Sequence, residues 1–500
     1  MVNVKRLLGE TLIYGIGAIL PRVITFLLNP LYIHYIDKQA FAVFTSLYAW
    51  IAFVNIVLTF GFETAYFRFA AVKNIPDQPV DAQATKQAAI AQESRVFNTA
   101  FWFVAGLAST FLISVLWLNQ PLANVLDYGA NPEFVRWMAW IAFFDALCML
   151  PFAWLRFYGY PVRYSLVRVM AIVLQTAVVI ALFTVVPPSI AASLGLTAQV
   201  AYPFYANLLA SIATFVMLLP IVARVRLRFD RVLFRQMIAY SYPVMLAGLA
   251  FMVNENFDKI IQYYLIDKAD AGAYGGCYKL AVLMTLFVTA YRMGIEPFLF
   301  KQMQSADAKQ TYARMTEYFA LFASVVALAM IANIGWLKRL FITDASYWTA
   351  IGIVPIIVIA NLCFGIYYNL STWYKVTDRT LVGSAISWVG AGLTIILHLL
   401  LLSRFGFMAS AWITLAVYAA MMIISYALGQ RFYPIAYRVK KVGALLAVMV
   451  VASVLVVWSD YAFWWSNALL IAYVVLLGYT ERKLLLPVWA KIKHRLPMIG

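Results

Sequence analysis

Charged residues are scarce in this sequence. Only 12% of its 500 residues are charged, whereas 64% are apolar or aromatic, and a soluble globular domain carries about 25% charged residues. The three cysteines, Cys148, Cys277 and Cys363, fall inside apolar runs without paired or metal-like spacing, which argues against a disulfide framework or a zinc site. The short alternating segments of a membrane β-barrel are also missing. These features together predict an all-α polytopic membrane protein.

Sequence motifs for common enzyme classes are missing too. The chain has no G-x-x-x-x-G-K-[ST] loop, H-E-x-x-H helix or G-x-S-x-G elbow. The longest predicted loop lies around Asp77 to Gln92, and the loops on the opposite face are shorter, which leaves no room for an extramembrane catalytic lobe. We therefore expect a transporter and not an enzyme.

Apolar runs long enough to cross about 30 Å of hydrocarbon recur along the whole chain. Lys5 and Arg6 precede the first run, which continues past Pro21 without a small-residue cleavage site, so we expect an uncleaved span there and not a signal peptide. The fourteen predicted spans cover residues 11–34, 41–66, 96–118, 134–155, 164–186, 200–222, 238–264, 273–297, 316–336, 350–374, 381–402, 410–430, 443–459 and 466–480.

The basic residues test this topology. Most of the 38 Lys and Arg residues fall in alternate loops and at the two termini, and such residues are retained on the cytoplasmic side of short loops. We therefore expect both termini in the cytoplasm. The formal charge of +17 is then a topology signal, helped by anionic lipid, and does not indicate a nucleic-acid partner.

A short sequence repeat indicates internal duplication. Ile36-Asp37-Lys38 follows the first span and recurs as Ile266-Asp267-Lys268 after the seventh. Six spans per repeat would relate the halves by an axis along the membrane normal, an arrangement that places the substrate between them. The predicted organisation is a six-helix bundle (1–222), a basic cytoplasmic linker (223–237), a second six-helix bundle (238–430), and two additional helices with a basic tail (431–500).

Arg22 and Asp145 lie near the centres of predicted spans one and four. A charge at such a position costs roughly 2.5 to 3.5 kcal/mol on insertion scales, so it is a candidate for function. Arg22 would bind a phosphate or carboxylate in a central cavity through its planar fork, or it would form a buried ion pair with Asp145. An unpaired Asp145 could carry a proton. Arg168 begins span five, and we expect its side chain to snorkel to the interface.

Three charges cluster in predicted span seven. Glu255 and Lys259 are one helical turn apart and can neutralise each other, with Asp258 beside them as a further coupling or ion-pair candidate. The alternative places Lys259 in the wall of a cavity, as a ligand of the cargo.

Two other spans also carry charges. Span eight holds Lys279 and Arg292, with Glu296 one turn after Arg292, and here the sequence leaves open ion pairing, snorkelling to the interface and cargo binding. Glu63 and Arg68 lie at the inner end of span two, where they are candidates for a gate. Among the deepest residues cations outnumber unpaired acids, which favours an anionic cargo over a cationic drug.

Four sequence motifs resemble the polysaccharide exporter family of the multidrug/oligosaccharidyl-lipid/polysaccharide exporter superfamily. The resemblance extends over nearly the whole chain. It is carried by Gly61-Phe62-Glu63-Thr64-Ala65-Tyr66-Phe67-Arg68-Phe69, by Asp258-Lys259 followed by Gly272-Ala273-Tyr274, by Trp373-Tyr374-Lys375-Val376-Thr377, and by Phe405-Gly406 followed by Ser410-Ala411-Trp412.

This resemblance implies a bacterial inner-membrane flippase that works by alternating access. Its cargo would be a polyprenyl-diphosphate-linked glycan for cell-surface polysaccharide or lipopolysaccharide, with the diphosphate held by Arg22, Lys259, Lys279 and Arg292 and the lipid tail in a bilayer-facing groove that involves the two additional helices. The resemblance also implies Na⁺ or H⁺ as counter-ion at an unknown site, no cofactor, a glycan polymerase as a partner, and a monomer.

Three other functions stay open on the sequence. A cation-coupled multidrug exporter of the same fold would have acidic residues dominating its cavity. A membrane-embedded glycan polymerase or ligase would need a long outward loop. A non-transporting scaffold would have its interior charges fully paired around a closed, dry centre.

Overall fold

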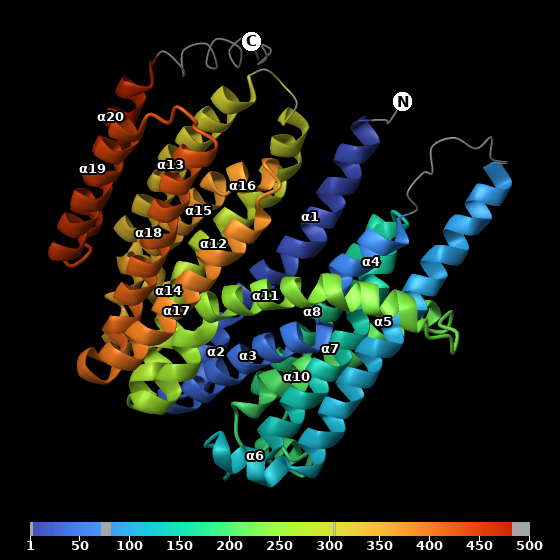
Figure 1. Ribbon diagram of the computed structural model, residues 1–500. Helices are drawn as coiled ribbons and strands as arrows, with labels where there is room; N and C mark the ends of the chain where they lie inside the picture. The colour runs from blue at the N-terminus through green and yellow to red at the C-terminus, as the bar shows by residue number, and fades with distance from the viewer. Residues whose placement is uncertain (1–3, 72–81, 304, 306, 483–500) are drawn as a thin grey trace, which may run out of the picture. The chain divides into compact units, whose positions relative to one another are not determined.

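The computed structural model describes residues 4–71, 82–303, 305 and 307–482, and in these ranges the chain is helical without strands. Figure 1 shows the labelled helices. The first ten are α1 (Val4–Leu27), α2 (Asn29–Tyr35), α3 (Lys38–Thr59), α4 (Phe62–Ala70), α5 (Ala82–Trp117), α6 (Asn119–Val125), α7 (Glu133–Phe157), α8 (Pro161–Thr184), α9 (Pro188–Ser193) and α10 (Ala201–Val222). The others are α11 (Arg231–Leu265), α12 (Lys268–Gln302), α13 (Ala308–Ala332), α14 (Ile334–Phe341), α15 (Ile353–Leu370), α16 (Thr372–Val376), α17 (Thr380–Phe405), α18 (Phe407–Phe432), α19 (Val439–Trp458) and α20 (Phe463–Thr480).

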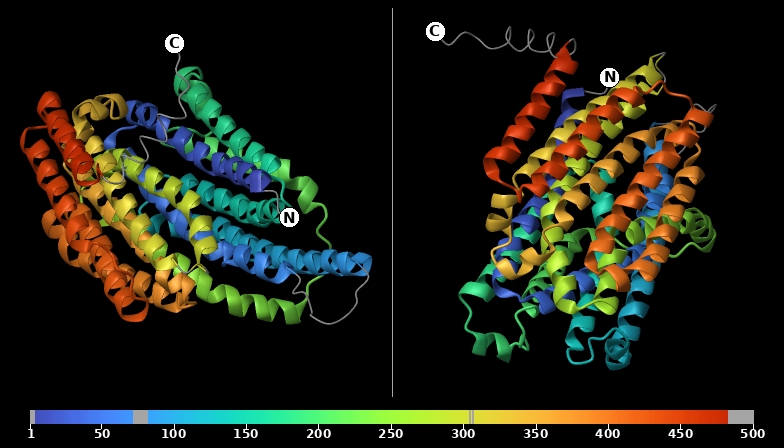
Figure 2. Two further views of the ribbon diagram at one scale, coloured as in Figure 1. Left: turned by 90° about the horizontal axis from the view of Figure 1, so that it is seen from above. Right: turned by 90° about the vertical axis from the view of Figure 1, so that its left-hand side faces the viewer.

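Fourteen helical segments of the described chain are long and apolar enough to cross a membrane. Each overlaps one of the fourteen predicted spans, so the predicted all-α, fourteen-span fold class is confirmed. Several spans are longer than the apolar run that predicted them. The light-blue helix α5 in Figure 2, for example, begins at Ala82, well before the predicted start at residue 96.

The chain groups into two compact units. The first unit comprises Met1–Gly275 and Ala391–Arg404, and the second comprises Gly276–Gly390 and Phe405–Gly500. In the first unit α11 packs against α3 and α4, so α11 belongs with the helices that precede the basic linker. The division into two six-helix bundles at residues 223–237 stays a prediction.

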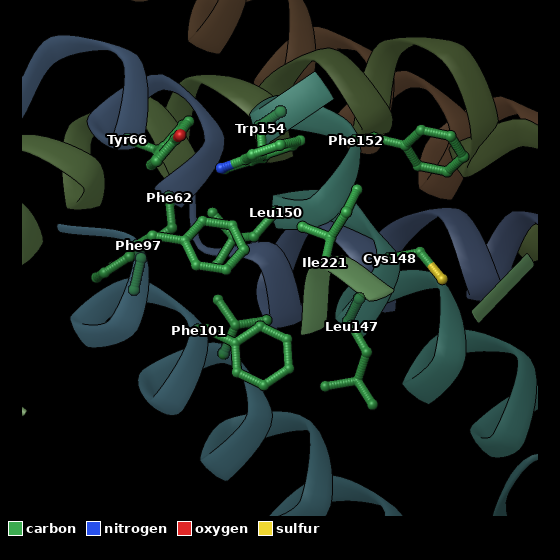
Figure 3. Close-up of a cluster of buried hydrophobic side chains, with 14 of the residues drawn as sticks. Phe62, Tyr66, Phe97, Phe101, Leu147, Cys148, Leu150, Phe152, Trp154 and Ile221 are labelled. Carbon is green, nitrogen blue, oxygen red and sulfur yellow. The ribbon is translucent and has the colours of Figure 1, made fainter. Parts of the chain in front are cut away.

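A core of apolar side chains holds α4, α5, α7 and α10 of the first unit together (Figure 3). Phe62, Phe97 and Phe101 cluster on one side of it, and Cys148 and Phe152 lie on the other. Alanines of α7 are fully buried here, as their small side chains let neighbouring helices approach closely. A buried carboxylate, Glu93, accepts hydrogen bonds from Tyr66 Oη (2.5 Å) and Tyr158 Oη (2.9 Å) and so has partners for both oxygens.

The second span breaks into α3 and α4 at Phe60 and Gly61. Both residues have left-handed backbone angles, with φ of 50° and 70°, a conformation that costs little only for glycine. A Cβ at Gly61 would lie 3.0 Å from the carbonyl oxygen of Ser241 on α11. The break separates α4 from α3 and leaves Glu63 in the first turn of α4.

The basic segment before α11 is fixed to α5. Arg226 N donates to Asn98 Oδ1 (3.0 Å), and Trp102 Nε1 donates to Arg226 O (3.0 Å). Asp230 is the N-cap of α11, accepting from the backbone N–H of Leu233 and Val232, and it also pairs with Arg95. These hydrogen bonds, that from Leu233 first, hold the pKa of Asp230 below its usual range.

Both copies of the repeated triplet form the same structure. Asp37 caps α3 by accepting from Ala40 N (3.0 Å), and Asp267 caps α12 by accepting from Ala269 N (2.8 Å). The two helix starts also pack together, because a Cβ at Gly272 would lie 1.7 Å from the carbonyl oxygen of Lys38. The repeat therefore marks equivalent helix starts that need a glycine where they meet.

In the second unit α15 packs against α13 and α18, and α13 also contacts α19 and α20. Figure 1 shows α19 and α20 side by side. The Trp373 motif is structural here, since its buried indole donates to Ser425 O (3.1 Å). The two additional helices are thus integrated into the second unit through α13.

Candidate functional site

A polar cavity of about 610 Å³ lies within the first unit. Its wall comes from α1, α3, α4, α7, α8 and α10. The lining side chains include hydroxyls, amides, two arginines and two carboxylates, a composition that the hydrocarbon core of a membrane does not tolerate unless water or a ligand is present. The polar lining residues are Thr25, Asn55, Thr59, Glu63, Asp145, Arg156, Tyr164, Arg168, Gln175, Asn207, Ser211 and Thr214.

Asp145 of α7 is an exposed side chain of this wall. Its Oδ1 accepts a hydrogen bond from Ser211 Oγ of α10 (2.8 Å). Asn55 and Asn207 line the same cavity, and Asn55 Oδ1 is buried without a hydrogen-bond partner. A polar atom left in this way indicates that water or a cargo hydroxyl completes the site.

Arg168 of α8 supplies a positive charge to the cavity. Its guanidinium lies 4.1 Å from the ring centroid of Phe152 and 5.7 Å from that of Tyr164. The side chain is exposed, and no ion pair to it is present in the described ranges. Stacking on aromatic faces holds the planar fork in place and leaves its N–H groups available to an anion. We had expected Arg168 to snorkel, whereas its side chain lines the cavity.

Glu63 and Arg156 form an ion pair in the same wall, between α4 and α7. The guanidinium of Arg156 also lies 5.2 Å from the ring centroid of Phe67 and 5.8 Å from that of Tyr164. Arg68 is separate: it is exposed and stacks on Tyr240 at 4.3 Å. Of the two gate candidates, Glu63 lines the cavity and Arg68 does not.

Arg22 is exposed and does not line the cavity, although its neighbour Pro21 does. In the described part of the chain no ion pair joins Arg22 to Asp145, which accepts a hydrogen bond from Ser211. The ion-pair interpretation of Arg22 is therefore not supported by the structure, and its role as a ligand of the cargo stays a prediction.

In span seven Lys259 forms an ion pair with Asp258, and its expected pairing with the carboxylate of Glu255 stays a prediction. Lys259 Nζ bonds to Asp258 Oδ1 (3.0 Å) and to the backbone oxygen of Glu255 (2.8 Å). Tyr274 Oη donates to the other oxygen of Asp258 (2.6 Å). Because Asp258 is buried and Lys259 nearly so, an anion would have to break this pair to bind Lys259.

The remaining candidates lie in the second unit. Arg292 is exposed and stacks on Tyr368 at 4.4 Å, and Lys375 approaches the same ring at 4.1 Å. Lys279 is partly buried in α12. The side chain of Glu296 lies outside the described residues, so its expected pairing with Arg292 stays a prediction.

Sequence reasoning missed the polar stripes that build the cavity. Asn207, Ser211 and Thr214 recur on one face of α10 at helical spacing, as do Asn55, Thr59 and Glu63 along α3 and α4. On α8 the stripe comprises Tyr164, Arg168 and Gln175. A search for polar residues three, four or seven apart within apolar spans would have found all three.

Solved transporter structures share this fold. The chain superposes on a structure titled "Lipid II flippase MurJ, inward closed conformation" with a TM-score of 0.70 at 12% identity, covering 95% of this chain and 100% of that one. An inward-facing multidrug resistance MATE family transporter of the MOP superfamily gives a TM-score of 0.56 at 15% identity, with 87% and 96% covered. The Vibrio cholerae MATE transporter VcmN, in its bent form, gives 0.55 at 15% identity, with 85% and 96% covered. At such identities the likeness shows the fold alone.

Sequence comparison is consistent with this fold. No curated protein sequence matches the chain. A family model described as "Polysaccharide biosynthesis protein" matches residues 7–303, which is more than half of the chain and includes the whole cavity wall. Family and fold together indicate a multi-pass membrane protein. The chain belongs to the polysaccharide biosynthesis protein family.

Proposed function

We propose that the protein is a flippase for an anionic lipid-linked oligosaccharide of the polyprenyl-diphosphate type. It would move this cargo from the inner to the outer leaflet of a bacterial inner membrane by alternating access, for cell-surface polysaccharide synthesis. The observation that carries the proposal is a cation, Arg168, held on aromatic rings in a polar intramembrane cavity with no carboxylate paired to it in the described ranges.

The chemistry of the cavity fits both parts of such a head group. A guanidinium fork binds phosphate through two parallel hydrogen bonds. The amides and hydroxyls of Asn55, Asn207 and Gln175 can exchange hydrogen bonds with sugar hydroxyls, since they offer donors and acceptors. A volume of about 610 Å³ falls within the range of small-ligand sites, so it accommodates a diphosphate with its first sugars.

Asp145 gives a second function a specific observation. An exposed carboxylate in an intramembrane cavity also suits a cation-coupled multidrug exporter of this fold. That function predicts loss of transport in Asp145→Asn, with Arg22→Ala and Arg168→Ala tolerated. The flippase predicts the opposite result, in which the arginine substitutions impair transport more than Asp145→Asn does.

The flippase can be tested with the purified full-length chain in liposomes. We expect a fluorescent polyprenyl-diphosphate disaccharide placed in one leaflet to appear in the other, while a cationic dye gains no pathway. In cells, deletion of the gene should accumulate the lipid-linked sugar on the cytoplasmic side, and re-expression should clear it. Faster movement of the dye than of the lipid would overturn the proposal, and lengthening of the glycan by the purified chain would indicate a polymerase.

The Glu63–Arg156 pair yields a prediction for charge reversal. Glu63→Arg or Arg156→Glu alone places two like charges in the cavity wall, so we expect each to lower flipping at least about tenfold, equivalent to about 1.4 kcal/mol. The double variant restores the opposite charges and should recover a substantial part of the rate. Equal defects in the double and single variants would show that the pairing of these two charges does not determine the flipping rate. Arg68→Glu is the control outside the cavity.

A further inference from the structure

The second unit contains a charged hollow joined to an apolar one, and neither shares a residue with the cavity that the proposed function assigns to the cargo's head group. The charged hollow, of about 680 Å³, lies between the start of α13, the α18–α19 connection and the end of α20. The apolar groove, of about 220 Å³, runs between α13, α15, α18 and α19. They share Ala313, Glu317 and Arg438, so they form one continuous amphiphilic surface.

The charged hollow, named here the basic cup, holds four cations and two acids. The cations are Lys309, Arg314, Arg438 and Lys441, and the acids are Glu317 and Glu481.

Ion pairs inside the basic cup account for both acids. Glu317 is buried and pairs with Lys441 (3.1 Å) and Arg438 (3.8 Å), and Lys441 also pairs with Glu481. Four positive and two negative charges leave a net charge of +2. The surplus falls on Arg314, which has no ion pair in the described ranges, and on Lys309, whose Nζ lies 4.5 Å from the ring centroid of Tyr433.

The groove below the basic cup is almost entirely apolar. Gly443 of α19 lines it and leaves open space, with no atom within 4 Å of the position of a Cβ. Its apolar lining includes Ala320, Ile366, Leu370, Met422, Ile423, Val439, Val442 and Leu446.

We infer that this surface binds an anionic membrane phospholipid, with its phosphate in the basic cup and one acyl chain in the groove. Charge complementarity favours this occupant, since a zwitterionic head group offers no net charge to the surplus of +2. The charge bias predicts that the basic cup lies on the cytoplasmic side, where anionic lipids attract basic residues. The bound lipid would join α19 and α20 to α13 and act as a structural ligand. The proposed function places the cargo's head group in a cavity that shares no residue with this surface. The family resemblance implies the cargo's lipid tail as the competing occupant of a groove at these helices, so the test includes competition by a polyprenyl diphosphate.

The inference can be tested by titrating the purified full-length chain in detergent with phosphatidylglycerol, with phosphatidylethanolamine of the same acyl chains, and with inorganic phosphate. We expect phosphatidylglycerol to raise the unfolding temperature in a saturable manner and the other two to leave it unchanged. An equal rise with phosphatidylethanolamine, or a rise with inorganic phosphate, would overturn the inference. So would displacement of bound phosphatidylglycerol by an equimolar polyprenyl diphosphate, because this would assign the groove to the cargo.

Two matched pairs of variants separate the basic cup from the groove. Lys309→Gln with Arg314→Gln should weaken phosphatidylglycerol binding by about 10- to 30-fold, on the basis of about 1 kcal/mol per surface cation. Lys440→Gln removes a neighbouring exposed charge that does not line the basic cup and should change affinity less than threefold. Gly443→Leu fills the groove and should abolish the saturable binding.

Gly478→Leu is the control for the groove, because Gly478 of α20 also has open space around its Cβ position but does not line the groove. If the Lys309→Gln/Arg314→Gln and Gly443→Leu variants bound phosphatidylglycerol as tightly as the parent chain, the site would be refuted whether or not flipping survives. Conversely, failure of the flipping assay with lipid binding intact would refute the proposed function alone.

Discussion

Arg168→Ala is expected to weaken cargo binding and slow flipping strongly while leaving the protein folded and in the membrane. The guanidinium stacks on Phe152 and Tyr164 and forms no ion pair in the described chain. Asp145, the carboxylate whose charge it attracts in the same cavity, keeps its hydrogen bond from Ser211 when the guanidinium is removed. A hydrogen bond to a charged group contributes about 1.5 to 3 kcal/mol, which corresponds to a loss of roughly 10- to 150-fold in cargo affinity. Initial rates of lipid flipping in liposomes, at several cargo concentrations, measure this loss.

Two further variants make the result specific. Arg168→Lys keeps the charge but loses the planar fork, so we expect an intermediate rate. Arg163→Ala removes an exposed arginine from the first turn of the same helix, outside the cavity, and should flip at the parent rate. If Arg163→Ala and Arg168→Ala were equally impaired, the defect would lie in membrane insertion or topology, and the cavity would not bind the phosphate.

The number of spans could be predicted from the sequence because each requires only a local property, namely a run of apolar residues of sufficient length. The residues of the cavity wall could not, since the side of a helix that faces a cavity depends on its packing against other helices. Arg22 looked more important than Arg168 because it is central in its span, whereas the structure places Pro21 in the cavity wall and Arg22 beside it. Depth along a span is readable from sequence, and rotation about its axis is not.

Ion-pair partners on different helices were the second feature that the sequence could not predict. In span seven the ammonium group of Lys259 bonds to the adjacent carboxylate of Asp258, one of the expected ion-pair candidates. Tyr274, from the next helix, completes that pair. Likewise Glu63 and Arg68 were grouped by closeness in sequence, although Glu63 pairs with Arg156, which lies far along the chain on α7. Spacing rules find neighbours on one helix and cannot rank them against residues that the fold brings near.

The repeated triplet leads to the prediction with the largest effect on folding. Both copies begin a span, and the start of α12 packs so closely on the start of α3 that a Cβ at Gly272 would lie 1.7 Å from the carbonyl oxygen of Lys38. A backbone carbonyl cannot rotate away as the end of a side chain can, so Gly272→Ala forces the two helices apart. We expect a destabilisation of at least about 3 kcal/mol, at the upper end of overpacking effects, seen as loss of monodisperse protein and a lower unfolding temperature.

The same helix supplies the controls for Gly272→Ala. Gly294 of α12 has no atom within 4 Å of its Cβ position, and Gly275 faces the flexible side chain of Thr45 at 2.6 Å. Gly294→Ala should be neutral or stabilise by about 0.5 to 1 kcal/mol, since alanine favours a helix, and Gly275→Ala should fall between the two. This order tests close helix contact directly, because helix propensity alone predicts that all three substitutions stabilise. A Gly272→Ala protein as stable as the Gly294→Ala protein would show that the repeated helix starts do not touch in the membrane.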